Sequence, residues 1–105
     1  MSKKIGGKTQ EEIDAFVKEH GKGNVTLVTL KETGQHFWFK KPDMNTMKAS
    51  AKIGQDNPIE GAIVYFTNCL IDGDKKACED PGIFASLAEE LNNLLHIQET
   101  EVKNF

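Results

Sequence analysis

The 105 residues predict an α+β domain in which an early β-hairpin precedes a helical second half. Two runs rich in β-branched and aromatic residues lie close together at 24–30 and 36–41, and the patterns after them are helical. Strands and helices that are segregated along the chain are typical of α+β folds. We therefore expect a short N-terminal helix, a β-hairpin and then three helices packed around a central apolar helix.

The first eight residues carry charge and glycine with one apolar side chain, Ile5. Such a segment offers little to bury, so we expect a flexible N-terminal arm at 1–8 and one domain at 9–105.

A first helix is indicated directly after this arm. Thr9 and Glu12 have the spacing of a capping box, and Gly21 stands where a C-terminal glycine cap belongs. The apolar stripe of this helix comprises Ile13, Phe16 and Val17.

The two extended runs predict a β-hairpin with Gly34 in its turn. Alternation leaves apolar side chains on both faces of each strand. A two-stranded hairpin is marginal in water, so it must pack on helices, gain strands from another copy, or both. We therefore expect self-association into a homo-oligomer.

Pro42 ends the second strand and Asp43 can cap a helix that stops before 54–56. The next helix, at 57–74, is the most apolar, with Asn57 as its cap, Pro58 in its first turn and Gly73 as its stop. Its expected buried stripe is Ile59, Ala62, Ile63, Phe66, Cys69 and Leu70. Val64, Tyr65 and Ile71 lie off that stripe.

A last helix opens at Asp80 and Pro81 with the same cap-then-proline pattern. Its stripe consists of Phe84, Leu87, Leu91, Leu94 and Leu95, with Val102 and Phe105 as a possible extension.

The formal net charge of -3 argues against sequence-independent binding to nucleic acid, because phosphates attract a basic surface. The chain has neither a signal-peptide pattern nor an apolar run long enough to span a bilayer. We expect a cytoplasmic protein without a membrane partner. The two cysteines, Cys69 and Cys78, are too few for a disulfide scaffold.

Catalytic and metal-binding patterns are weak. The three histidines and two cysteines show no pair with metal-ligand spacing, and no motif tied to a mechanism or a cofactor occurs. Cys69 falls on an apolar helix stripe, whereas Cys78 lies in a charged loop without a histidine nearby in sequence. We expect no enzyme, no cofactor and no metal; catalysis through Cys78 stays open as an alternative.

The run at 36–41, His-Phe-Trp-Phe-Lys-Lys, suggests a second alternative. Exposed aromatics beside lysines can stack bases and hold phosphates, as a small nucleic-acid-binding regulatory protein would require. The rival reading is that these aromatics pack in the core.

From the first helix onward, at 9–103, the chain resembles a family of small tail assembly chaperones of phages and prophages. The segments that carry the resemblance are Lys18-Glu19-His20-Gly21-Lys22, Phe39-Lys40-Lys41-Pro42-Asp43, Asp56-Asn57-Pro58, Asn68-Cys69 with Gly73-Asp74, and Phe84-Ala85-Ser86-Leu87.

The resemblance implies a non-enzymatic assembly chaperone or adaptor in the cytoplasm of a bacterial host. Such proteins coat a long helical tape measure protein before the tail tube assembles around it. A client helix can lie in a groove between amphipathic helices, and many weak contacts along one client add up through multivalency. Our candidate partner-binding residues are Trp38, Val64 and Tyr65, for each of which burial in the core is the competing interpretation.

Overall fold

The computed structural model describes residues 4–91, 94 and 100–105. The described elements are, in order, α1 (Gln10–His20), β1 (Val25–Thr29), β2 (His36–Lys40), α2 (Met44–Asp56), α3 (Pro58–Cys69), β3 (Leu70–Asp72), the 3-10 helix η1 (Lys75–Glu79) and α4 (Pro81–Leu91). The strands form an antiparallel sheet in the order β1-β2-β3. The predicted α+β class is confirmed.

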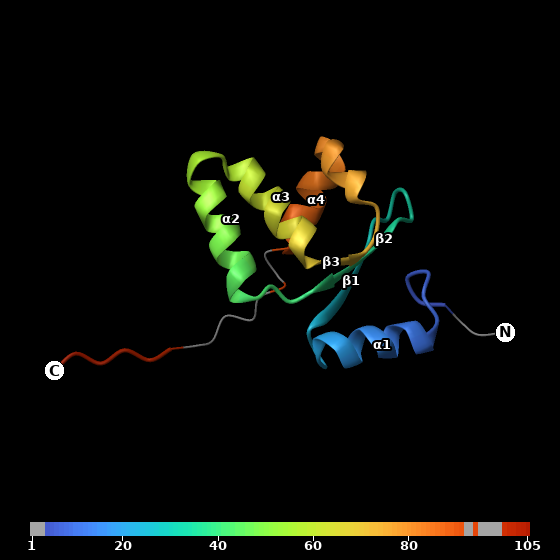
Figure 1. The fold of residues 1–105 in the computed structure, drawn as a ribbon, viewed down its shortest axis with the longest axis horizontal. Coiled ribbons are helices and arrows are strands. Elements are labelled where there is room, and N and C mark those ends of the chain that lie inside the picture. The colour runs from blue at the N-terminus through green and yellow to red at the C-terminus, as the bar shows by residue number, and fades with distance from the viewer. Residues whose placement is uncertain (1–3, 92–93, 95–99) are drawn as a thin grey trace.

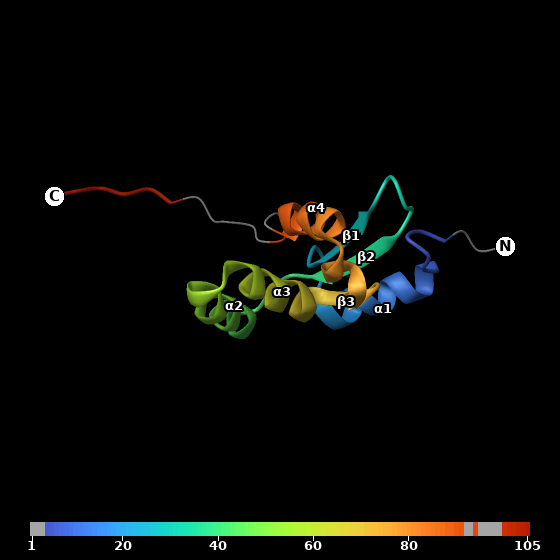
Figure 2. The same cartoon turned by 90° about the horizontal axis from the view of Figure 1, so that it is seen from above.

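The sheet separates two helical layers. Figure 1 shows α1 on one side and α2, α3 and α4 on the other. Viewed from above, α4 lies toward the β1 side of the sheet and α3 toward the β3 side (Figure 2). The middle strand, β2, is therefore covered on both faces.

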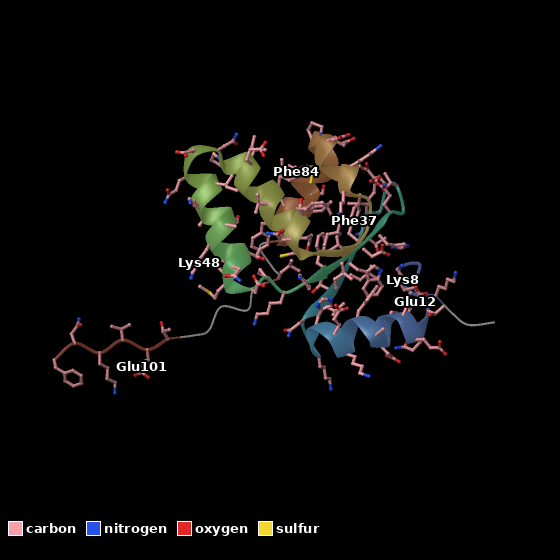
Figure 3. The ribbon with its side chains drawn as sticks, viewed as in Figure 1. Lys8, Glu12, Phe37, Lys48, Phe84 and Glu101 are labelled. Atoms are coloured by element: carbon pink, nitrogen blue, oxygen red, sulfur yellow. The ribbon has the colours of Figure 1, made fainter. Side chains whose placement is uncertain are left out.

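Alternation along β2 supplies both layers with aromatic side chains. Phe37 and Phe39 point toward the α3 side, where Figure 3 shows Phe37 directed at the helices, and both are fully buried with Phe66 of α3. The ring centroids of Phe39 and Phe66 are 5.6 Å apart, and those of Phe37 and Phe66 are 6.3 Å apart, both edge to face. The remaining members of this core are Cys69, Ala77, Leu87 and Leu91.

Trp38 points to the opposite face and is covered by α1. Its ring centroid lies 5.6 Å from that of Phe16, and its Nε1 donates a hydrogen bond to the Gly6 carbonyl at 3.0 Å. This contact needs a glycine, because Gly6 has a φ of 58° and a Cβ there would lie 2.7 Å from the Leu27 side chain.

Residues 4–8, part of the segment expected to form a flexible arm at 1–8, contact the sheet in this structure; residues 1–3 lie outside the described part of the chain. Ile5 and Lys8 form a β-bridge, and the Lys8 ammonium pairs with the Asp72 carboxylate at 2.5 Å and with Glu12 at 3.8 Å. Figure 3 shows Lys8 and Glu12 side by side. The turn is held by contacts with residues distant in sequence, which its composition does not reveal.

The predicted helix starts are confirmed by their caps. Thr9 and Glu12 make the reciprocal capping box of α1, Asp43 accepts a hydrogen bond from the Thr46 N–H at 2.8 Å, and Asn57 accepts one from the Glu60 N–H at 3.2 Å. Local side-chain chemistry is sufficient for these starts.

The central helix is shorter than expected, because α3 ends at Cys69 and Leu70–Asp72 forms β3. The free edge of β2 explains this correction: β3 gives its backbone groups partners, with Trp38 opposite Asp72 and Phe39 opposite Leu70. The expected buried face is also only partly right. Phe66 and Cys69 are buried, Ala62, Ile63 and Leu70 are half-buried, and Ile59 is 63% exposed.

A close contact joins α2 and α3. The Ser50 hydroxyl donates to the Gly61 carbonyl at 2.8 Å, and a Cβ on Gly61 would lie 2.7 Å from the Gly54 Cα. These small residues let the two helix backbones approach each other.

The described part of α4 ends at Leu91. Leu94 is not helical and packs on the core, and the expectation for Leu95 lies outside the described residues. Val102 and Phe105 are fully exposed and not helical, contrary to their expected role as an extension. Within the described residues, no helix combines the length and apolar character needed to cross a membrane.

Candidate partner-binding groove

A groove of about 790 Å³ runs between α2, α3 and α4. Its lining is mostly apolar or small: Ser50, Ala51, Gly54, Gln55, Pro58, Gly61, Ala62, Tyr65, Ala88 and Leu91. We name this feature the α2–α4 groove.

Small side chains create the groove. Ala51, Ala62 and Ala88 each leave the space that a larger residue would fill on its helix. Gly54 and Gly61 also line the groove and add no side chain that would fill it. A side chain from a partner helix could therefore insert between the three helices, as in other helix-in-groove complexes.

Tyr65 forms one wall of the groove and also packs against the core. Burial, followed by the proximity of Cys69, raises the pKa of the Tyr65 hydroxyl to about 12. The hydroxyl is therefore protonated at neutral pH, and it offers a partner a hydrogen-bond donor beside an aromatic ring.

The outer surface of α2 next to the groove carries exposed methionines. Met44, 64% exposed, and Met47 precede Ala51 at helical spacing, so the three lie along one side of α2. Methionine adapts its shape to different partners and is common at promiscuous binding surfaces. Lys48 and Lys52 are exposed on the same helix, and Figure 3 shows Lys48 on its outer side. An apolar surface bordered by positive charge results.

The three predicted partner residues lie in different surroundings. Tyr65 lines the α2–α4 groove, whereas Val64 is half-buried and is not among its lining residues. Trp38 is 5% exposed and lies across the sheet, beneath α1. For Trp38, burial in the core is the correct interpretation.

Sequence reasoning missed the small residues that shape the groove. Gly54 and Gly61 lie inside helices, where glycine is unfavourable relative to alanine by roughly 0.5–1 kcal/mol. A glycine inside a helix indicates a close approach of another backbone. The sequence offered that signal at Gly61, but the preceding helix was expected to stop before 54–56; α2 instead continues to Asp56 and includes Gly54.

The aromatic strand offers no stacking surface for nucleic acid. The side chains of Phe37 and Phe39 are fully buried, and Trp38 is covered by α1. Bases could reach these rings only after a helix had been displaced, so no observation favours the nucleic-acid alternative.

Both cysteines are free thiols with raised pKa values. Burial raises the pKa of Cys69 to about 11, and burial with the neighbouring Glu79 raises that of Cys78. Each thiol is therefore protonated at neutral pH and a weak nucleophile. Among the residues that the structure describes, no three His, Cys, Asp or Glu side chains converge as a metal site would need.

Comparison with family models, with curated proteins and with solved structures finds no match. We therefore infer function from the α2–α4 groove and its surroundings.

Proposed function

We propose that the chain is a non-enzymatic tail assembly chaperone or adaptor of a phage or prophage, which acts in the cytoplasm of the bacterial host. Its client is a long helical tail protein of the tape measure type, and the chaperone self-associates. The observation that carries this proposal is the α2–α4 groove, an apolar channel between three helices with an adaptable methionine side.

The shape and lining of the groove favour a helical client. Apolar side chains at positions i, i+3 or i+4, and i+7 of an amphipathic helix would enter the space above Ala51, Ala62 and Ala88. The Tyr65 ring and the Leu91 side chain then provide apolar contact on the walls. Such a contact is modest in area and gives weak affinity per copy.

The charges beside the groove favour a client helix that is acidic on its exposed flank. Lys48 and Lys52 would meet this flank at the rim, where charges raise association rates and set orientation more than affinity. Several copies along one long client then gain effective concentration from one another.

Co-expression with the long helical tail protein encoded nearest to this chain tests the proposal. We expect the two proteins to purify together at many copies per client, and the client to stay soluble only with the chaperone present. A client that aggregates equally with and without this chain would contradict the proposal.

A matched pair of variants directs the test to the groove. Ala51 and Ala85 are both exposed alanines within helices, but only Ala51 lines the groove. Ala51→Trp should fill the space and abolish co-purification, while Ala85→Trp should leave it unchanged. Equal loss in both variants, or in neither, would place the client elsewhere.

A further inference from the structure

Within the described residues, the outer edge of β1 has backbone groups without a hydrogen-bond partner. The Lys41 N–H donates to the Asn24 carbonyl at 2.9 Å, and the Leu30 N–H donates to the Gln35 carbonyl at 2.9 Å. Because backbone direction alternates in an antiparallel strand, Thr26 and Val28 also point their N–H and C=O groups toward β2. The groups of Val25, Leu27 and Thr29 therefore point outward, and within the described residues β1 pairs only with β2.

A second groove, of about 580 Å³, adjoins this edge. One wall comes from β1 and the turn that follows it. The other wall comes from α4, which lies toward the β1 side of the sheet (Figure 2). The lining residues are Val28, Thr29, Leu30, Lys31, Glu32, Thr33, Asp80, Gly82, Ile83, Ser86, Glu89 and Glu90. We name it the β1-edge groove; a further strand on this edge would lie beside α4 and fill it.

The charge of the β1-edge groove is acidic. Glu32, Asp80, Glu89 and Glu90 line it against a single cation, Lys31. Its apolar part consists of Val28, Leu30 and Ile83, which also pack against the core. The occupant should therefore be an extended segment accompanied by positive charge.

We propose that this occupant is β1 of a second copy, paired antiparallel about Leu27. This register sets Val25 opposite Thr29 of the second copy and Leu27 opposite Leu27, so that all outward backbone groups of both strands find partners. The interface is isologous, because each copy offers the same surface to the other. The two three-stranded sheets become one continuous sheet.

The same register supplies the positive charge. In the antiparallel pair, the turn before β1 of the second copy, which carries Lys22, lies at the same end as the turn after β1, which carries Glu32 of the β1-edge groove. Lys22 and Glu32 are both exposed, and two-fold symmetry makes the contact twice. Sheet pairing would thus be joined by two opposite-charge pairs.

This inference deepens the self-association part of the proposed function. It uses a different groove from the client site, so it is tested on the full chain alone, without client. Sedimentation velocity over a range of concentrations should show a monomer–dimer equilibrium that shifts to monomer on dilution. A monomer at every concentration up to the solubility limit would overturn the inference.

A proline on the edge strand tests whether dimerisation depends on backbone pairing through β1. Val25→Pro removes an outward N–H without removing a bond to β2, and edge strands tolerate proline. We expect a folded monomer, with the circular dichroism spectrum of the parent. A folded variant that still dimerises as the parent does would overturn the inference.

Charge reversal gives a test that leaves the backbone intact. Lys22→Glu and Glu32→Lys should each weaken association roughly tenfold, and the double variant should restore it, because both pairs are then reversed together. Lys48→Glu makes the same charge change on the outer side of α2 and should have no such effect (Figure 3). Single effects without restoration in the double variant would exclude this register.

Measuring client binding distinguishes a failure of this dimer interface from a failure of the proposed chaperone function. If Val25→Pro is monomeric but still binds the client, the interface is confirmed and client binding does not require it. If the parent is monomeric and still binds the client, the inference fails and the proposed function stands.

Discussion

The two faces of β2 are covered in different ways. On one face Phe37 and Phe39 join Phe66 in a fully buried aromatic cluster under α3 and α4. On the other face Trp38 is covered by α1, a helix with no buried residue of its own, and by the turn at 4–8. The first face is stabilised by a large buried apolar surface, whereas the covering of the second face is held by a few specific contacts.

This difference predicts unequal local stability. Elements with few buried apolar contacts open at lower free energy than the core does. We therefore expect α1 and the preceding turn to open without unfolding of α3 and α4. The same strand thus takes part in both a stable and a labile region.

The largest effect is expected in the aromatic cluster. Phe66→Ala should reduce the free energy of unfolding by about 3–5 kcal/mol, because it leaves a cavity among Phe37 and Phe39. Urea denaturation monitored by circular dichroism measures this change in the free energy of unfolding. Ile59→Ala, on the exposed side of the same helix, is the control and should change stability by less than about 0.5 kcal/mol. A denaturation midpoint unchanged in Phe66→Ala would show that the cluster is not the core.

A smaller and local effect is expected on the opposite face. Trp38→Phe keeps an aromatic ring but loses the hydrogen bond to the Gly6 carbonyl, at a cost of about 1 kcal/mol. Hydrogen exchange should then accelerate in α1 and at 4–8 while the amides of α3 keep their protection. Equal acceleration in α1 and α3 would mean that the two faces open as one unit.

The smallest effect concerns the acid response of α1. Hydrogen bonds from the Thr9 backbone and hydroxyl lower the pKa of Glu12, so its contribution is present above the unfolded pKa and is lost as the pH falls through the folded value. Protection of the first turn of α1 should therefore decrease below about pH 4.3, the ordinary pKa of a glutamate.

Glu12→Gln separates the capping box from general acid effects. Glutamine can accept the same hydrogen bonds but does not titrate, so the acid response of the first turn should flatten. Glu11→Gln loses the same charge without touching the box, and its profile should follow that of the parent. An unchanged profile in Glu12→Gln would contradict this assignment.

Only part of the candidate site could be predicted from the sequence. Tyr65 was found because it lies off the apolar stripe of α3, and it lines the α2–α4 groove. Trp38 was also proposed, because an aromatic beside lysines suggests a surface; the identity of a residue does not tell which helix covers it. The pairing of Gly54 with Gly61 depends on how α2 and α3 meet.

Local sequence patterns are sufficient for the starts of α1, α2 and α3, the hairpin of β1 and β2, and the segregation of strands and helices. Each follows from interactions within a few residues of the chain, as in the capping box of Thr9 and Glu12.

Only the tertiary structure decided the features that need a distant partner. Residues 70–72 continue a helical pattern, yet they form β3 because the edge of β2 offers them backbone hydrogen bonds. Residues 4–8 have the composition of a free arm, yet Trp38 and Asp72 hold them. Ile59 shares the period of Phe66 but lies in the first turn of α3 and is 63% exposed, since periodicity gives a face and not the length of the neighbour that covers it.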